Sequence, residues 1–218
     1  MSQNPVAYKG RVKYDEQRSR KYQDRKPTKH NAEMQLLDRA FALIPPGHRV
    51  LDVPCGGGRV SVHLAQKGYK ICAADLSDAM IEITRENFKN NDIVATVEKQ
   101  DVESFTFKDG AFDTIVSFRL FHHFPDREIR ARVVRQLCRV AGKNVVLSYF
   151  SPLSFTSAKN RLRSALGGKK STKYATSLAE IEGYFQSEGF RLVKDFAQLP
   201  LVHTLHVAVF QRDTDSKQ

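Results

Sequence analysis

The stretch VLDVPCGGGR, residues 50–59, decides the fold because it joins an apolar strand to a helix through a glycine-rich turn. A helical pattern of apolar residues follows directly, over residues 60–67. Glycines let the backbone approach a ligand closely, and the N-terminus of the following helix favours an anionic group. Taken alone, the turn is as compatible with a tight strand-to-helix connection that binds no ligand as with a nucleotide-like binding site.

Working outward from this turn, apolar runs and helical patterns alternate along the chain. The short connections between them predict an α/β fold with a parallel sheet covered by helices. The third, fourth and fifth runs are apolar enough for strands buried on both faces. About three residues around Pro200 separate the last two runs, which predicts an antiparallel pair. Predicted strands cover residues 49–53, 69–74, 93–99, 112–118, 144–150, 191–199 and 203–211, and predicted helices cover 31–43, 60–67, 78–90, 126–140 and 177–188.

The chain of 218 residues is long enough for one sizeable hydrophobic core, so we expect a single domain. Its parts would be an arm (1–31), a cofactor-binding core (32–150), an insertion or lid (151–176) and a C-terminal helix with a strand pair (177–212). We see no apolar stretch near the roughly 20 residues that cross a bilayer and no secretory signal, so we expect a cytoplasmic protein.

The three cysteines, Cys55, Cys72 and Cys138, are widely spaced, and they form no CxxC pair. The chain also has no set of histidines near them. This pattern argues against a disulfide framework and against a zinc site. We therefore expect three buried thiols and no bound metal.

The net charge of +11 is concentrated in two segments. Residues 1–31 hold nine Lys or Arg and three acids, and residues 151–173 hold six Lys or Arg and no acid, so each segment carries +6. The rest of the chain is almost neutral. A local basic segment indicates an anionic partner, although solubilising charge explains such segments equally well.

Two acidic residues stand where a nucleotide-like ligand would need them. Asp75 ends the second predicted strand, 19 residues beyond Gly56, at the spacing from which a carboxylate accepts hydrogen bonds from ribose hydroxyls. Asp101 follows the third strand, where it would meet the exocyclic amine of an adenine. Singly, each is as readily a cap or loop residue. Their joint placement at the carboxyl ends of parallel strands predicts a ligand site.

These segments resemble a known family. Residues 50–88, VLDVPCGGGRVSVHLAQKGYKICAADLSDAMIEITRENF, are similar to motif I and the following acidic motif of class I S-adenosylmethionine-dependent methyltransferases. KQDVESFTF (99–107) resembles the loop that holds the adenine, and FDTIVSFRLFHHFPD (112–126) resembles the fourth-strand segment of small-molecule members. The resemblance implies a single Rossmann-like sheet of seven strands, mostly parallel with an antiparallel C-terminal strand and helices on both faces. It also implies S-adenosylmethionine as cofactor.

The resemblance implies a cofactor site built from four segments. The glycine loop would contact the methionine part of the cofactor, and the end of the second strand would contact the ribose. The loop after the third strand would hold the adenine, and the end of the fourth strand would lie near the sulfonium. Pro54 stands where the family usually has glycine, which removes an N–H donor. A Rossmann dehydrogenase would instead show G-x-G-x-x-G right after the first strand. The implied contacts are Asp52, Pro54, Gly56, Gly58, Asp75, Leu76, Met80, Asp101, Val102, Ser117 and Phe118.

Candidates for the methyl-transfer step follow the fourth strand: Arg119, His122, His123 and Asp126. Transfer needs alignment and, for an oxygen acceptor, a base. His122 is the candidate catalytic base, because an unperturbed imidazole accepts a proton near neutral pH. Packing beside the cofactor explains His122 equally well, and we expect His123 on a helix surface.

The two basic segments are the expected acceptor-binding parts, since the family places acceptor recognition in an N-terminal extension and an insertion after the fifth strand. We therefore expect an anionic small molecule, or a lipid-linked or glycan substrate, methylated at oxygen or nitrogen. Tyr14, Tyr22, Arg119 and Lys169 are the candidate contacts.

Other readings of the basic charge stay open. Apolar and basic residues interleave over 152–166, which would suit an amphipathic helix on an anionic membrane. RNA ranks behind a small or lipid-linked acceptor because no RNA-binding module is recognisable. A catalytically inactive scaffold also ranks behind, because the glycines of the loop and both acidic residues are present.

Overall fold

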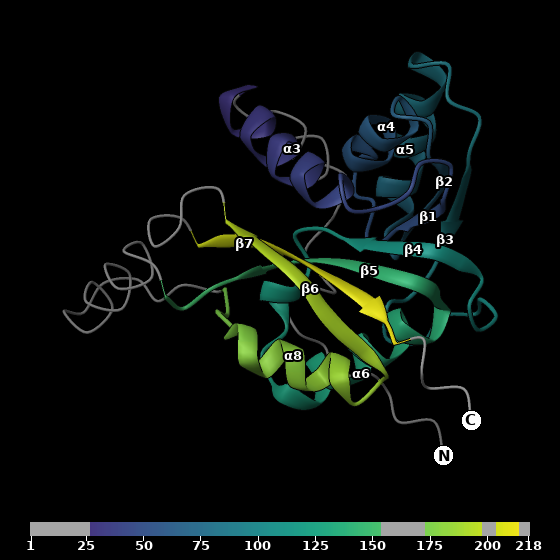
Figure 1. Ribbon diagram of the computed structural model, residues 1–218. Coiled ribbons are helices and arrows are strands. Elements are labelled where there is room, and N and C mark those ends of the chain that lie inside the picture. Colours follow the sequence, from purple (N-terminus) through teal and green to yellow (C-terminus); the bar gives the residue numbers. More distant parts are fainter. Residues whose placement is uncertain (1–26, 154–172, 198–203, 214–218) are drawn as a thin grey trace.

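The computed structural model describes residues 27–153, 173–197 and 204–213. Its centre is a seven-stranded sheet with the order β3-β2-β1-β4-β5-β7-β6 (Figure 1). β7 runs antiparallel to both of its neighbours, β5 and β6, and the other neighbouring strands of the sheet are parallel. The predicted fold class is therefore confirmed. The strands are β1 (Arg49–Asp52), β2 (Lys70–Asp75), β3 (Thr96–Lys99), β4 (Phe112–Ser117), β5 (Ala141–Phe150), β6 (Phe190–Ala197) and β7 (Leu205–Arg212).

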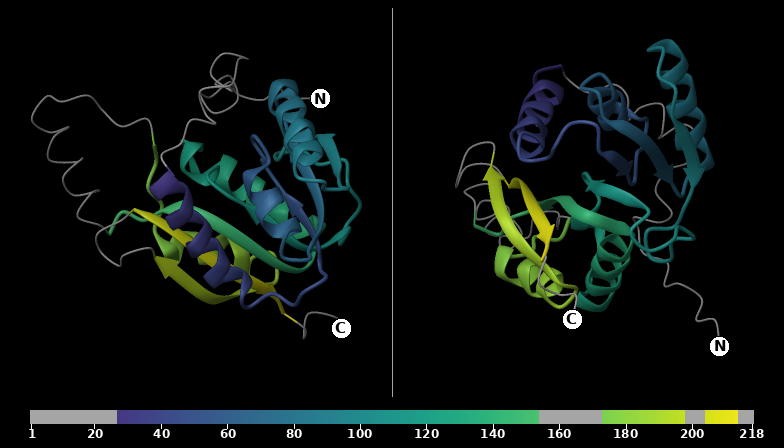
Figure 2. Two further views of the ribbon diagram at one scale, coloured as in Figure 1. Left: turned by 90° about the horizontal axis from the view of Figure 1, so that it is seen from above. Right: turned by 45° about the vertical axis from the view of Figure 1, so that its right-hand side comes forward.

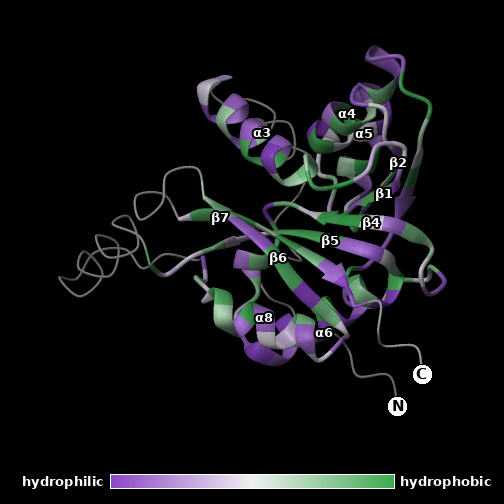
Figure 3. Cartoon of the chain, viewed as in Figure 1, coloured by the Kyte–Doolittle hydropathy of each residue, from purple (hydrophilic) through white to green (hydrophobic). Residues whose placement is uncertain are grey.

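Helices cover both faces of the sheet (Figure 2). α3 (Pro27–Phe41), α4 (Arg59–Ala65) and α5 (Asp78–Asn90) lie on one face, and α6 (Arg127–Val140) and α8 (Leu178–Gln186) lie on the other. Successive strand residues point to opposite faces, so each strand feeds two hydrophobic cores. The central strands accordingly carry much of the apolar sequence (Figure 3).

Three helices begin at a polar residue whose side chain accepts a hydrogen bond from the first turn. Ser77 caps α5, Asp126 caps α6 and Ser177 caps α8. Such caps satisfy backbone N–H groups that have no partner within the helix. They fix where each helix starts relative to the strand before it.

Some predicted boundaries differ from the structure. α3 begins at Pro27 rather than at residue 31, because its first turn carries no apolar signal. β3 begins at Thr96 rather than at residue 93, and the expectation that it is buried on both faces is wrong: its residues are exposed or half-buried. The physical reason is its position at the edge of the sheet, beside β2. β6 and β7 pair antiparallel, as predicted, and residues 198–203 between them lie outside the described residues.

Cys55, Cys72 and Cys138 are free thiols in the interior, as expected. Burial raises the pKa of each of them. Within the described ranges, none of the helices combines the length and apolar character that a membrane crossing requires.

Candidate cofactor site

The glycine-rich loop between β1 and α4 is held by backbone bonds on both sides. The Cys55 N–H donates to the Ala74 carbonyl of β2 at 2.8 Å, and the Gly58 N–H donates to the Cys55 carbonyl at 2.9 Å. Gly58 has φ +77°, and a Cβ there would lie 2.9 Å from Cγ2 of Thr84. Glycine is therefore required at this position for its backbone conformation and for space.

Helix α5 supports the same loop through two side chains that sequence reasoning missed. The Thr84 hydroxyl donates to the Gly56 carbonyl at 2.6 Å, and the Asn87 amide donates to the Gly57 carbonyl at 2.7 Å. The sequence contains one signal for Thr84: it is a polar residue on the apolar side of α5, where it is buried together with Met80. These bonds fix the loop carbonyls and so the orientation of its peptide groups.

Asp75, at the end of β2, lies against the glycine loop. Its Oδ2 accepts a hydrogen bond from the Gly56 N–H at 2.9 Å, and its Oδ1 accepts one from the Ser77 N–H at 2.9 Å. Only 7 % of the residue is exposed, and burial raises the pKa of this carboxyl. Each carboxylate oxygen can accept a further bond, so the geometry suits a ligand with hydroxyl groups.

Asp52, at the end of β1, is fully buried behind the loop. Its Oδ2 accepts a hydrogen bond from the Ser61 hydroxyl of α4 at 2.6 Å. Burial raises the pKa of Asp52 to about 7. The side chain thus ties the strand end to α4, and its support of the loop at the cofactor stays a prediction.

The residues predicted to surround the adenine follow β2 and β3. Met80 is buried, whereas Leu76 is 38 % exposed. Val102 is half-buried and packs against the core of the α6 face. Asp101 Oδ1 accepts a hydrogen bond from the Glu103 N–H at 3.0 Å, so it also closes its own turn. Contact of these residues with an adenine stays a prediction.

Ser117 and Phe118 lie buried at the end of β4, as expected for residues that close a pocket. Within the described part of the chain, the Ser117 hydroxyl is buried without a hydrogen-bond partner. The Arg59 guanidinium lies over the Phe118 ring, 5.3 Å from its centroid.

These residues fit an adenosyl sulfonium cofactor. The ends of β3, β2, β1 and β4 are adjacent in the sheet, so all four predicted segments lie along one edge. That edge offers a carboxylate for hydroxyl groups, a loop in which a Cβ at Gly58 would collide, and the buried Ser117 hydroxyl. Such edges are where open α/β sheets bind ligands.

Arg119 lies beside this edge, immediately after Phe118. Its φ of +67° is unusual for a side chain of this size, and its N–H donates to the Ser148 hydroxyl at 2.6 Å. Its guanidinium lies 5.4 Å from the centroid of the Phe150 ring, and Lys173 Nζ lies 5.2 Å from the same centroid. Two cationic groups therefore meet at the end of β5.

His122 is buried in the short 3-10 helix η1 (Phe121–His123), with 1 % of the residue exposed. Its ring stacks on Phe150, with the centroids 4.1 Å apart and the planes 6° from parallel. This is the packing arrangement that the sequence left open, and a role as base stays a prediction. His123 ends the 3-10 helix η1, where it is half-buried, and its ring lies against the His122 ring with the centroids 4.2 Å apart.

Asp126, the remaining candidate near the transfer step, is the N-cap of α6. Its Oδ1 accepts a hydrogen bond from the Ile129 N–H at 2.8 Å. Of the predicted acceptor contacts, Tyr14, Tyr22 and Lys169 lie outside the described residues, as does most of the predicted lid.

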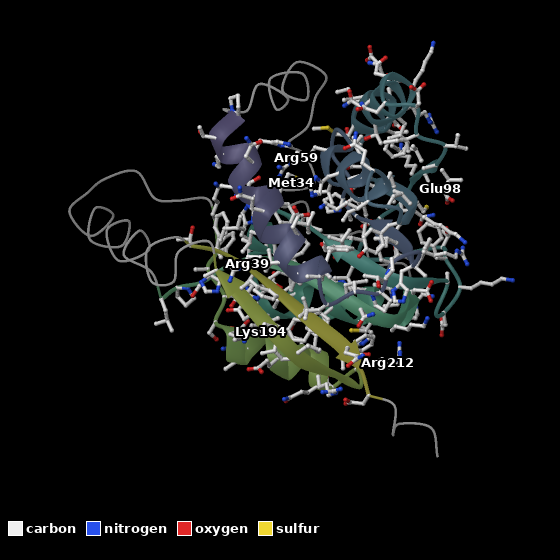
Figure 4. All side chains as sticks on the ribbon, turned by 45° about the horizontal axis from the view of Figure 1, so that its top comes forward. Met34, Arg39, Arg59, Glu98, Lys194 and Arg212 are labelled. Carbon is white, nitrogen blue, oxygen red and sulfur yellow. The ribbon has the colours of Figure 1, made fainter. Side chains whose placement is uncertain are left out.

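Glu33 of α3 joins the site, although no role was predicted for it. Its carboxylate lies 2.6 Å from the Arg59 guanidinium and 3.4 Å from that of Arg119, and only 2 % of its side chain is exposed. Figure 4 shows Arg59 beside α3, close to Met34. The signal that was missed is a carboxylate one helical turn before Leu37, on the buried side of the helix.

Comparisons with known proteins agree with this geometry. Residues 50–144 match the family described as "Methyltransferase domain". Ubiquinone biosynthesis O-methyltransferase from Xanthomonas axonopodis pv. citri (strain 306) is 31 % identical over 102 residues, which are 46 % of this chain and 43 % of that protein. The same enzyme from Coxiella burnetii (strain Dugway 5J108-111) is 31 % identical over 97 residues, 44 % of this chain and 42 % of that protein. The chain thus spans under half the length of these relatives.

Solved structures share the fold at low sequence identity. Magnesium protoporphyrin IX methyltransferase from Synechocystis PCC 6803 with bound SAH has a TM-score of 0.69 and 19 % identity, and the match covers 97 % of this chain and 90 % of that one. A TehB-like SAM-dependent methyltransferase from Corynebacterium glutamicum has a TM-score of 0.66 and 20 % identity, covering 91 % and 100 %.

The seven-stranded sheet is thus the Rossmann-like fold that these solved methyltransferases share. Residues 50–144, under half of the chain, match the methyltransferase domain family, and the solved methyltransferases share the fold.

Proposed function

We propose that this protein transfers a methyl group from S-adenosylmethionine to an oxygen or nitrogen of an anionic small molecule, or of a lipid-linked or glycan substrate. The observation that carries the proposal is the bond from the Gly56 N–H to Asp75, 2.9 Å long, which brings the glycine loop and the acidic residue into one site. The relatives named O-methyltransferase favour oxygen.

In this proposal the chain binds and orients the two reactants. Asp75 accepts hydrogen bonds from the ribose hydroxyls, Asp101 and Val102 hold the adenine edge, and Phe118 excludes water near the sulfonium. S-adenosylmethionine, when bound, supplies a methyl group activated by a positively charged sulfur. Alignment of the acceptor atom with that group is the main requirement for transfer.

The support for an anionic acceptor is the charge at the end of β5. Arg119 and Lys173 both lie over Phe150, and Lys173 is the last residue of the second basic segment. A guanidinium pairs with carboxylate or phosphate in a fixed geometry. Tyr14, Tyr22 and Lys169 complete the proposed contacts, within a basic arm and a lid that fold over a single domain.

His122 is the proposed base for a hydroxyl acceptor, taking its proton at an imidazole nitrogen. We expect His122→Phe to lower kcat by about 100-fold, because general-base contributions have at least that size. Phenylalanine preserves a flat ring against Phe150, so SAH affinity and the melting temperature should change little. Steady-state kinetics with the identified acceptor would show this. Full activity in His122→Phe would leave His122 with a packing role only.

The acceptor class is tested by labelling. The protein is incubated with tritiated S-adenosylmethionine and a cell extract that has been separated into anionic metabolites, lipids and RNA. We expect label in the anionic metabolite or lipid fraction. Arg119→Gln, which removes one cation at the end of β5, should reduce that label.

Two other outcomes would contradict the proposal. Label in RNA alone would support the alternative of an RNA methyltransferase. Binding of S-adenosylhomocysteine without label in any fraction would support an inactive scaffold. Association with anionic vesicles would support peripheral membrane contact beside the methyl transfer, and the cytoplasmic location stays a prediction.

A further inference from the structure

We propose that Glu33 is a positioning residue of the cofactor site, acting through Arg59 and Arg119. The inference rests on the proposed function and deepens it, because it concerns how the same site is held in shape. Its basis is a buried carboxylate between two guanidinium groups that come from the two sides of the site.

The first step is the burial of Glu33. Its side chain is 2 % exposed, and a buried carboxylate is costly unless it is paired with cations. Its Oε2 lies 2.6 Å from Arg59 and its Oε1 lies 3.4 Å from Arg119. The Glu33 carboxylate therefore constrains the positions of both arginines, because each guanidinium lies beside a different oxygen of the same carboxylate.

The second step is where the two arginines come from. Arg59 directly follows Gly58 and begins α4, so its position is tied to the glycine loop. Arg119 directly follows Phe118, beyond the end of β4. Each guanidinium also lies over an aromatic ring, Arg59 at 5.3 Å and Arg119 at 5.4 Å from the ring centroid. Glu33 thereby bridges the first residue of α4 and the residue after Phe118, beside the two segments that would flank the methionine part.

The third step is that α3 has a second attachment that does not involve the site. Asp38 lies 2.6 Å from His63 and 3.2 Å from Lys67, both near the far end of α4 from the loop. Asp38→Asn therefore removes one acidic charge from the same helix and loosens its contact with α4, as Glu33→Gln does. It leaves the two arginines of the site untouched. It is the matched control.

The test is calorimetric titration of the full chain with S-adenosylhomocysteine (SAH), together with melting temperatures. We expect Glu33→Gln to weaken SAH affinity by about tenfold, the size of a lost interaction between coupled charged groups. Asp38→Asn should lower the melting temperature less than Glu33→Gln does, because the Asp38 ion pairs are more exposed, and it should change SAH affinity by less than about twofold.

A double-mutant cycle shows whether Glu33 acts through Arg59. If it does, the double variant Glu33→Gln/Arg59→Gln should bind SAH about as tightly as whichever single variant binds it less tightly. The first substitution already removes the ion pair between the two residues, so the second has no further effect through it. Independent, additive losses would contradict the proposal. Glu33→Asp keeps the charge but is one methylene shorter, so it should reach one arginine and weaken binding by about threefold. This variant decides the question if Glu33→Gln does not fold.

The failures of the two proposals are distinguishable. If the unmodified chain does not bind SAH, the proposed function fails and this inference with it. If the chain binds SAH and Glu33→Gln binds equally well, only this inference is wrong. Equal weakening by Asp38→Asn would likewise overturn it, because the effect would then come from docking of α3 in general.

Discussion

Gly58 carries two separate constraints, and Gly47 provides a control for one of them. Both have a positive φ, +77° and +76°, but a Cβ at Gly47 would meet no atom within 4 Å. We expect Gly47→Ala to cost about 1 kcal/mol of unfolding free energy from backbone strain alone. Gly58→Ala should cost about 3 kcal/mol, because the added methyl also collides with Thr84.

Urea unfolding and SAH titration of both variants check this expectation. Gly58→Ala should also bind SAH weakly, whereas Gly47→Ala should bind it normally. Equal costs for the two substitutions would show that the close approach of α5 to the loop has no energetic consequence.

Asp52 predicts a pH dependence of stability. Its pKa in the folded protein is raised to about 7 by burial, above its ordinary value of 3.8. Between these values the unfolded chain has lost the proton that the folded chain keeps, so ionisation of Asp52 destabilises the fold as the pH rises from 4 to 7. Asp52→Asn mimics the protonated form. We expect it to match the natural chain near pH 4 and to exceed its stability by on the order of 3 kcal/mol near pH 8.

The measurement is urea unfolding of both proteins across that pH range. A stability difference that stays constant with pH, or that shrinks as the pH rises, would show that the pKa of Asp52 is not raised in the folded protein.

At the scale of elements, substitutions of Asp126, the N-cap of α6, can show whether this residue has a structural or a catalytic role. Asp126 accepts a hydrogen bond from the Ile129 N–H, as an N-cap does. We expect Asp126→Ala to lower the unfolding free energy by about 1 kcal/mol and Asp126→Ser, which keeps a cap, to lower it less. Neither should change methyl transfer to the acceptor identified by labelling. A large loss of transfer in both variants would instead place Asp126 at the reacting atoms.

Most elements were predictable from the sequence because local patterns decide them. Apolar runs marked the central strands, and Ser77 and Asp126 marked the starts of α5 and α6. The length and the burial of the edge strand β3 were overestimated. An apolar run in the sequence does not reveal whether the strand has a neighbouring strand on both sides. The start of α3 was missed because its first turn is polar.

The candidate site was predictable only in part. Asp75 and the glycine loop follow from spacing along the chain, Asp52 follows from the family resemblance, and the structure places all three at the ends of β1 and β2. Glu33 is 26 residues from Arg59 and 86 from Arg119 in the sequence, so their meeting depends on how α3 docks. Thr84 looked like one polar residue of an amphipathic helix. Such long-range contacts have no local signature.

For the whole molecule, the sheet order separates the predicted cofactor residues from the cationic groups that we propose contact the acceptor. β3, β2, β1 and β4 bring the predicted cofactor residues to one edge, whereas β5 ends beside Arg119 and Lys173. The segment that matches the methyltransferase domain ends at residue 144, before the second basic segment begins. The comparisons therefore bear on the donor, and the acceptor has to be found by experiment.

Calorimetric titration of the whole chain with SAH tests the central claim most directly, with Asp75→Asn as the matched variant. We predict saturable binding at one site per chain, and binding at least tenfold weaker in Asp75→Asn, because the amide replaces one of the two carboxylate acceptors. An absence of binding at millimolar SAH, or equal binding by Asp75→Asn, would contradict the assignment of this edge as a cofactor site.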